Sequence, residues 1–245
     1  NEKHKEAFKS TMNKILATFI FIACVAGIRA QKIDPDDSFT FELCLPNSTA
    51  NKPFREIMQG VVSASPYYQY TLKNSLSFGV GANYSYFAIN QFRVTQKIFG
   101  GMHQGVGFFK IGHEKFWSER MGTDIGVKIG YSELFVISDL LKAQDITFRR
   151  MNGIFVEPTI SYVITMDVNS SIRFVFGFPF YNFKFQPWTI GEGSWVYSTS
   201  SSGDNNTPGV YDKTTAKSNS RAFTIGFGYT FYFNGKKSEP WLDSE

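Results

Sequence analysis

The sequence has few of the groups that enzymes and metalloproteins use. Its 245 residues include two cysteines, Cys24 and Cys44, and three histidines. His103 and His113, the two histidines beyond the N-terminal region, lie in no recognisable catalytic motif, and two histidines with no cysteine at ligand spacing do not form a zinc site. We therefore expect a protein that is not an enzyme, with no catalytic residues, no metal and no cofactor.

Long apolar runs and a strong net charge are also missing. Beyond the N-terminal region, no segment has the roughly 18 consecutive apolar residues that a membrane-spanning helix requires. The net charge of +4 is small and scattered, which argues against a nucleic-acid partner. Aromatic residues are abundant, at 17% with 26 phenylalanines, yet the mean hydropathy is −0.19. Such a composition is typical of a membrane β-barrel, in which apolar and polar faces alternate.

The N-terminal region has the features of an export signal. Lys14 precedes an apolar run over residues 15–28, and Ala30 offers a cleavage site for a signal peptidase. We therefore expect residues 1–30 to be an upstream segment and signal peptide, 31–233 the mature barrel, and 234–245 a short periplasmic tail. An alternative interpretation treats residues 21–24 as a lipobox with Cys24 acylated. If Cys24 is removed, Cys44 remains alone and no intramolecular disulfide forms.

Alternation of large apolar with small or polar residues is the main structural pattern. In the last such stretch, residues 221–233, one face carries only large side chains and the other small or polar ones plus Tyr232. The large ones are Phe223, Ile225, Phe227, Tyr229, Phe231 and Phe233. A strand of this kind suits a wall with lipid outside and a narrow lumen inside.

Eight segments of this kind follow one another along the chain. The first is expected to end at Pro46. Adjacent Phe108 and Phe109 predict a bulge, and a change of phase near Tyr181 predicts another. Short connections near Lys73, Ser118 and Asn169 alternate with long ones over residues 46–60, 90–104, 138–152 and 187–220.

These observations predict an all-β fold, an eight-stranded antiparallel up-and-down transmembrane β-barrel. Short periplasmic turns and long extracellular loops would then alternate, with both termini periplasmic. A soluble lipocalin-like barrel shares the strand count. Its outer face would be polar, however, whereas here that face is rich in Phe, Ile, Val and Tyr.

The chain resembles the small eight-stranded outer-membrane β-barrel proteins of Gram-negative bacteria, in the broad company of the outer-membrane protein A membrane domain. The resemblance covers about residues 39–233 and rests on the strand 65–70 with the turn 73–76, the segment 155–158, and the closing strand 223–233. It implies an outer-membrane location, and it implies that Phe231 and Phe233 form the assembly signal read by the barrel-insertion machinery. The 12 residues after Phe233 are too few for a peptidoglycan-binding domain.

The lumen of so small a barrel is filled by side chains. The alternation predicts that five charged residues point into it: Glu42, Asp124, Lys128, Glu157 and Arg173. Lys110 and Glu114 also point into the lumen if the fourth strand keeps, beyond Phe108 and Phe109, the alternation with which it begins. Opposite charges in such an interior must pair, so we expect a structural salt-bridge network. The alternative is that these charges line a narrow pore or a gate.

The long loops are the expected sites of specific function. The last loop carries Trp188, Trp195, Tyr197 and Tyr211, which we interpret as partner-binding aromatics, although Trp188 and Trp195 also fit an aromatic girdle at the membrane surface. Lys142, Arg149 and Arg150 form a basic rim that suits the phosphates of lipopolysaccharide, or else are ordinary solvated charges.

Three functions remain open. The first and favoured one is a structural barrel or accessory subunit of an outer-membrane assembly, with other envelope proteins as partners besides outer-membrane lipid and lipopolysaccharide. The second is a transport barrel for small solutes or hydrophobic molecules. The third is a surface adhesin that binds through the loop over residues 187–220.

Overall fold

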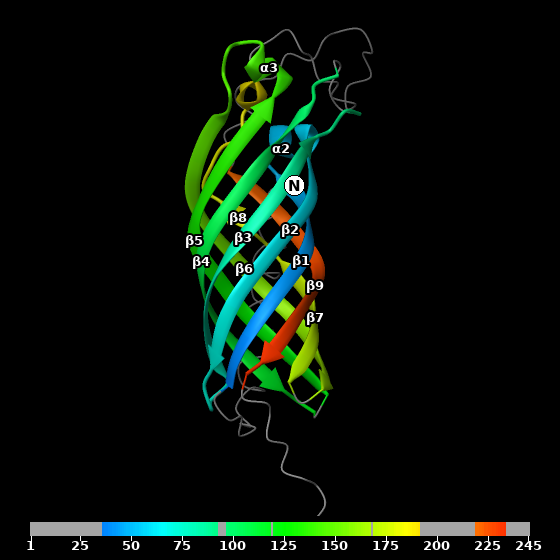
Figure 1. The fold of residues 1–245 in the computed structure, drawn as a ribbon, viewed down its shortest axis with the longest axis vertical. Coiled ribbons are helices and arrows are strands. Elements are labelled where there is room, and N and C mark those ends of the chain that lie inside the picture. The colour runs from blue at the N-terminus through cyan, green and yellow to red at the C-terminus, as the bar shows by residue number, and fades with distance from the viewer. Residues whose placement is uncertain (1–35, 93–96, 119, 168, 192–218, 234–245) are drawn as a thin grey trace, which may run out of the picture.

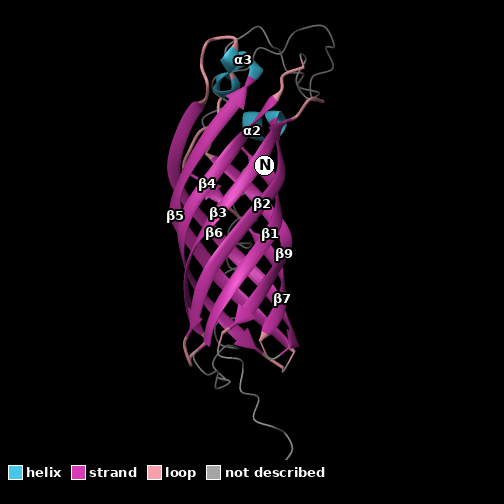
Figure 2. Cartoon of the chain, viewed as in Figure 1, coloured by secondary structure: helices cyan, strands magenta, loops and turns pink. Residues whose placement is uncertain are grey.

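The computed structural model describes residues 36–92, 97–118, 120–167, 169–191 and 219–233 (Figure 1). The predicted signal peptide and C-terminal tail lie outside these residues. Strands dominate the part of the chain that is described (Figure 2). They are β1 (Asp36–Ala50), β2 (Met58–Thr71), β3 (Leu76–Ile89), β4 (Gly100–Phe116), β5 (Met121–Ser138), β6 (Arg149–Asp167), β7 (Ser170–Gly177), β8 (Phe180–Tyr181) and β9 (Ser220–Tyr232).

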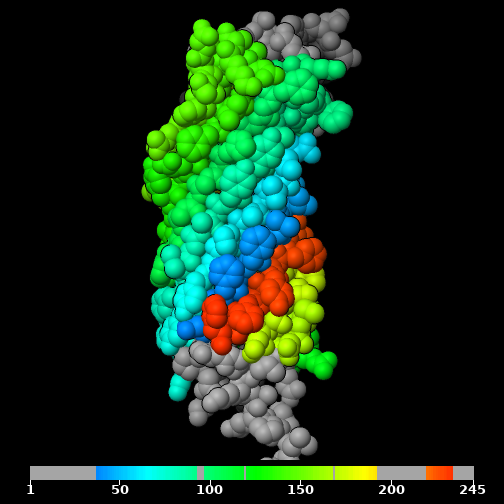
Figure 3. Space-filling view, in the orientation of Figure 1, coloured from blue at the N-terminus to red at the C-terminus, as the bar shows by residue number. Residues whose placement is uncertain are grey.

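The strands form one closed antiparallel ring. Each of β1 to β6 pairs with the next strand, β7 pairs with β9, and β9 pairs back with β1. The two-residue strand β8 continues the line of β7, because both lie between β6 and β9. The ring therefore has eight positions, which confirms the predicted eight-stranded antiparallel barrel. Figure 3 shows β1 to β5 packed side by side across one face of this wall.

The gap between β7 and β8 falls at Pro179, which has no backbone N–H to donate. The hydrogen bonds nevertheless continue across it, from Phe178 N to the Pro158 carbonyl and from Ala222 N to the Pro179 carbonyl, both 3.0 Å. The predicted bulge near Tyr181 is wrong, since inward and outward residues keep alternating through this segment. What changes there is that the aromatic residues move from the outer to the inner face.

Two other predicted features of the strands are also wrong. Strand β4 pairs with β3 and β5 without any register shift, so Phe108 and Phe109 make no bulge. Phe108 is buried inside the barrel and Phe109 is exposed outside. Strand β1 does not end at Pro46 but continues to Ala50. Pro46 lies beyond the last register pair of β1 with β2, in the stretch where β1 pairs with β9 alone, and its register partner there is Thr224.

The two ends of the barrel differ. One end has the three short turns, between β2 and β3, β4 and β5, and β6 and β7. The other end carries three short helical segments, which Figure 1 shows gathered at the top: α2 (Lys52–Ile57), α3 (Asp139–Lys142) and η1 (Pro187–Ile190). We call this helical end the cap end. The strands β4, β5 and β6 are the longest, with 17, 18 and 19 residues.

A belt of large apolar side chains surrounds the barrel. On β5 and β9, for example, the outward residues from Met121 to Tyr131 and from Phe233 to Phe223 are mostly apolar. Exposed members on other strands include Phe41, Leu45, Val80, Ile160, Phe174 and Phe178. No helix among the described residues combines the length and the hydrophobicity needed to cross a lipid bilayer.

Toward the cap end the polarity of the wall reverses. Outward positions become polar, as at Asn47, Gln59 and Lys184, whereas the interior becomes apolar. This apolar plug contains Phe54, Ile57, Phe87, Met102, Leu134, Val136, Phe155, Tyr181, Phe183, Phe185 and Ile190, all buried. Helix α2 supplies Phe54 and Ile57 from above, so the plug joins the cap to the strands. The sequence analysis did not predict this second, apolar filling of the lumen.

Phe54 tests how much the plug stabilises the barrel. Its ring is fully buried and lies 5.2 Å from Phe87 and 5.6 Å from Phe185 between ring centres. Phe54→Ala should lower the free energy of unfolding by about 3 kcal/mol, because a cavity replaces the ring. Phe178→Ala, on the outer wall, should cost less because lipid refills the space. Guanidinium unfolding of the barrel in lipid vesicles measures both, and equal losses would contradict a packed plug.

Candidate functional site

Below the apolar plug, the lumen holds the charged residues. The structure buries Glu42 from β1, Asp124 and Lys128 from β5, Glu157 from β6 and Arg173 from β7. Lys110 and Glu114 of β4 lie with them, since β4 keeps a single phase. The regular alternation of each strand places these seven side chains inside, and the register of the ring brings them to neighbouring levels.

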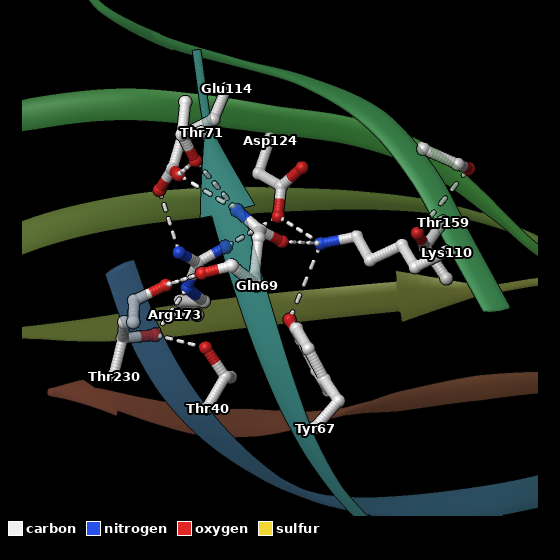
Figure 4. Close-up of polar contacts among 12 residues, drawn as sticks. Thr40, Tyr67, Gln69, Thr71, Lys110, Glu114, Asp124, Thr159, Arg173 and Thr230 are labelled. Atoms are coloured by element: carbon white, nitrogen blue, oxygen red, sulfur yellow. Dashed lines mark hydrogen bonds and ion pairs between the residues drawn. The ribbon is translucent and has the colours of Figure 1, made fainter. Parts of the chain in front are cut away.

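Arg173 is the centre of the lower part of this network (Figure 4). Its Nη2 lies 2.6 Å from Glu114 Oε1, and its Nη1 lies 2.5 Å from Asp124 Oδ2. Its Nε donates to Thr230 Oγ1 at 2.5 Å. The guanidinium therefore contacts β4, β5 and β9, and joins strands on opposite sides of the barrel.

Lys110 and Gln69 complete the lower part. Lys110 Nζ lies 2.5 Å from Asp124 Oδ2 and donates to Gln69 Oε1 at 2.7 Å. The Gln69 amide in turn donates from Nε2 to Glu114 Oε2 at 2.8 Å, and Thr71 donates to the same oxygen at 3.0 Å. Glu114 and Asp124 are thus linked in two ways. Arg173 contacts both directly, and Gln69 and Lys110 connect them by a second path.

Lys128 organises the upper part. Its Nζ lies 2.5 Å from Glu42 Oε2 and 3.6 Å from Glu157 Oε2. It also lies over the rings of Tyr67 and Phe108, 5.3 and 5.2 Å from their centres, which adds cation–π attraction. Tyr67 connects the two parts, because its hydroxyl donates to Glu42 Oε1 at 2.8 Å and accepts from Lys110 Nζ at 3.4 Å.

Glycines on the inner face make room for these long side chains. A Cβ on Gly177 would lie 2.5 Å from Glu157 Oε1, and one on Gly228 would lie 3.2 Å from Glu42 Cγ and 3.4 Å from Arg173 Cβ. A Cβ on Gly126 would lie 3.2 Å from Lys110 Cε. A lumen this narrow can hold seven charged side chains only if neighbouring inward positions carry no side chain.

The network is closed at both ends. On the side of the short turns, Phe116, Val163 and Tyr232 form a small apolar cluster, and the Tyr232 hydroxyl donates to Glu114 Oε1 at 3.2 Å. On the cap side, Phe108 and Tyr67 pack edge to face, 6.1 Å between centres, beneath the apolar plug. Side chains therefore fill the lumen as three stacked layers, apolar, ionic and apolar.

The predicted basic rim is not a group of free cations. Lys142 Nζ lies 3.5 Å from Asp139 Oδ1, and Arg150 pairs with Glu133 on the outer surface. Arg149 donates to the backbone carbonyl of Trp188, which holds η1 against the start of β6. Trp188 is partly exposed at the cap. Trp195, Tyr197 and Tyr211 lie outside the described residues.

The two histidines and the closing aromatics all lie on the outer wall. His103 Nδ1 hydrogen-bonds to the Tyr84 hydroxyl at 2.8 Å, and His113 is exposed. Phe231 and Phe233 are exposed near the short turns, with ring centres 5.5 Å apart. Within the described ranges, no three His, Cys, Asp or Glu side chains are placed to hold a metal ion.

The sequence analysis gave neither Tyr67 nor Gln69 a role in the network. The available signal was the unbroken alternation of β2, which sets both beside the charged positions of β4. The inward glycines were a second signal, because glycines that alternate with large outward residues indicate that another strand's long side chain occupies the lumen there.

Comparison with known proteins gives similarities of architecture. No protein-family model matches the chain, and no curated protein sequence matches it. Neisserial surface protein A (NspA) is similar in structure, with 8% identity and a TM-score of 0.46 over 80% of this chain and 96% of that one. Ail, the attachment invasion locus protein of Yersinia pestis, is similar with 9% identity and a TM-score of 0.44 over 82% of this chain and 100% of that one. Both are small eight-stranded outer-membrane β-barrels, the group that the sequence resembles.

A matched pair of arginine substitutions tests the network. Arg173→Gln removes a buried cation and leaves Glu114 and Asp124 with too little positive charge, so it should lower the unfolding free energy by about 3–5 kcal/mol. Arg150→Gln breaks an exposed pair with Glu133 and should cost less than about 1 kcal/mol. Urea unfolding of both variants in vesicles is the measurement. Similar losses for the two would show that the buried network is not a major source of stability.

Proposed function

We propose that this chain is an outer-membrane β-barrel without an open channel, and that it acts as a structural or accessory subunit rather than as an enzyme. Its interaction surface would be the outer wall and the cap end. The observation that carries this proposal is the filled lumen, in which an ionic layer lies between two apolar layers.

The apolar belt supports the membrane location. On β5 and β9 the belt extends over residues 121–131 and 223–233, about the 9–11 residues that a tilted strand needs to cross a bilayer. A soluble protein would expose this belt to water at a large cost in free energy. The closed ring also leaves no sheet edge to the lipid, which a membrane-spanning sheet requires.

The asymmetry of the two ends supports an orientation. Short turns are typical of the periplasmic end of such barrels, and longer connections of the extracellular end. Strand β1 begins and β9 ends at the side of the short turns. Both ends of the barrel would then be periplasmic, and the cap with α2, α3 and η1 would face outward.

The contacts with the surroundings follow from this orientation. Arg150 lies beyond Ile154, the last apolar outward residue of β6, and would therefore meet the phosphates of lipopolysaccharide. Lys142 and Arg149, which lie at the cap, would complete this basic rim. Arg150 would exchange its bond to Glu133 for a phosphate. Phe231 and Phe233, at the periplasmic end of β9, would be read by the barrel-insertion machinery.

A second candidate function, surface adhesion, is favoured by one observation. Phe92, in the connection between β3 and β4 at the cap end, is 96% exposed. An exposed aromatic ring on an extracellular connection can anchor a partner with little loss of entropy. Transport of small solutes is disfavoured by the layered filling of the lumen.

The closed lumen can be tested directly. We expect the purified barrel, refolded into a planar bilayer, to show no stable single-channel conductance, because no water-filled path crosses the ionic and apolar layers. A water-filled porin in the same bilayer provides the positive control. A large and stable conductance from this chain would overturn the proposal of a closed barrel.

The accessory role has a separate test. A tagged copy expressed at its natural level and extracted in mild detergent should retain a defined set of envelope proteins at near-equal stoichiometry, identified by mass spectrometry. An unrelated tagged outer-membrane barrel is the control for carry-over. If no other envelope protein is retained, the accessory role fails and the adhesin becomes the better candidate.

A further inference from the structure

The ionic layer of the lumen holds more carboxylates than cations. Among the described residues, its acidic members are Glu42, Glu114, Asp124 and Glu157, and its basic members are Lys110, Lys128 and Arg173. If all seven side chains were ionised, four negative charges would face three positive ones, and one negative charge would be left over. Apolar layers close the lumen above and below, so an uncompensated charge there would be costly. The layer therefore needs one further positive charge.

The distances show which carboxylate lacks a cation. Glu42, Glu114 and Asp124 each have a cationic nitrogen within 2.6 Å. Glu157 differs, because its ion pair among the described residues is with Lys128 alone, whose Nζ lies 3.6 Å from Glu157 Oε2. That separation is longer than a hydrogen bond, and the same nitrogen lies 2.5 Å from Glu42. Glu157 is thus the carboxylate without a cation of its own.

The other groups around Glu157 offer no second cation. Thr224 of β9 donates to Glu157 Oε1 at 3.1 Å, and a Cβ on Gly177 of β7 would lie 2.5 Å from that oxygen. The titratable groups close enough to act on Glu157 electrostatically are Glu42 and Cys44 of β1, Lys128 of β5 and Tyr181 of β8. Of these, only Lys128 can carry a positive charge.

A metal ion or a proton could supply the missing charge. A metal ion needs several ligands, and no three His, Cys, Asp or Glu side chains in the described part of the chain are placed to hold one. A proton needs a single carboxyl oxygen, and Glu157 Oε2 has only the long contact with Lys128. The Glu157 side chain is also the most exposed of the seven inside the lumen, at 7%, which leaves room for a water molecule to accept an O–H.

We propose that Glu42 and Glu157 together hold one proton in the folded barrel, carried on Glu157 Oε2, and that this proton balances the ionic layer. Two carboxylates that share one buried cation cannot both ionise without leaving an uncompensated charge. A neutral Glu157 fits the contacts, since one oxygen accepts from Thr224 and the other bears the proton. Lys128 is then left to Glu42. The inference depends on the closed lumen and not on the accessory role.

The proton makes the stability of the barrel depend on pH. A glutamate in the unfolded chain loses its proton near about pH 4, whereas the folded barrel keeps the proton on Glu157 at neutral pH. Folding therefore takes up a proton between these two ionisations, and raising the pH in that window favours the unfolded chain. From this group alone, each pH unit should raise the unfolding equilibrium constant about tenfold. Mild acid thus stabilises the closed lumen and alkali destabilises it.

Matched glutamine substitutions test the assignment through this pH dependence. Glu157→Gln reproduces the neutral acid in shape and charge, so the variant should fold. Glu133→Gln is the control, because Glu133 is a carboxylate on the outer surface, paired with Arg150. Urea unfolding in zwitterionic lipid vesicles is measured from about pH 5 to about pH 7. The unfolding constant of the unsubstituted chain, divided by that of Glu157→Gln, should rise about tenfold per pH unit. The same ratio taken with Glu133→Gln should stay constant.

Infrared spectroscopy detects the proton itself. A protonated carboxyl group has a C=O stretching band separate from the bands of amides and ionised carboxylates. The folded chain in a detergent without ester groups should show this band at neutral pH, and Glu157→Gln should abolish it. Glu42→Gln should abolish it as well, because Lys128 then has a single carboxylate to compensate and Glu157 ionises. Glu133→Gln should keep the band.

The outcomes separate this inference from the proposed function. A band that persists in folded Glu157→Gln, or a ratio of unfolding constants that does not change with pH, overturns the proton on Glu157. A band that survives in Glu42→Gln overturns the shared proton. If Glu157→Gln does not fold, the band of the unsubstituted chain and its loss in Glu42→Gln still decide. A barrel that conducts ions would defeat the closed lumen, whereas a non-conducting barrel without the band would defeat only this inference.

Discussion

The pairing of Arg173 with Glu114 and Asp124 is the interaction on which the lower barrel depends. A guanidinium held between two carboxylates, all three of them buried, is stable only if the charges compensate one another. Thr230, Gln69 and Lys110 supply further bonds, and among the described residues only Oδ1 of Asp124 is left without a hydrogen bond in these two carboxylates. This requirement explains why inward glycines lie beside the charged residues, since a methyl group at such positions would displace a member of the network.

The second constraint is the change of surroundings along the barrel axis. Where the outer wall faces lipid, polar groups belong inside and must satisfy one another. Toward the cap end the outer wall becomes polar on most strands, and the interior is packed with aromatic and aliphatic side chains around Phe54 and Phe155, as in a soluble domain. One ring of strands thus has two opposite patterns of polarity. The cap helix α2 packs against the apolar interior of the cap end through Phe54 and Ile57.

These two fillings leave the outside of the barrel as the surface available for function. The lumen holds side chains bound to each other, so in the proposed function interactions with partners fall to the wall and the cap. A barrel with no open path can then act by the contacts it makes.

The sequence by itself determined the strands, their order and the direction of nearly every side chain, because alternation with a period of two is a local property of the chain. It predicted the inward positions of Glu42, Lys128 and Arg173 for the same reason. Only the tertiary structure decided which charges pair, since register between strands far apart in sequence sets Arg173 beside Glu114. It also decided that Tyr181 and Phe183 fill the lumen. Their alternation is unbroken, but the level at which water replaces lipid outside is a property of the whole ring.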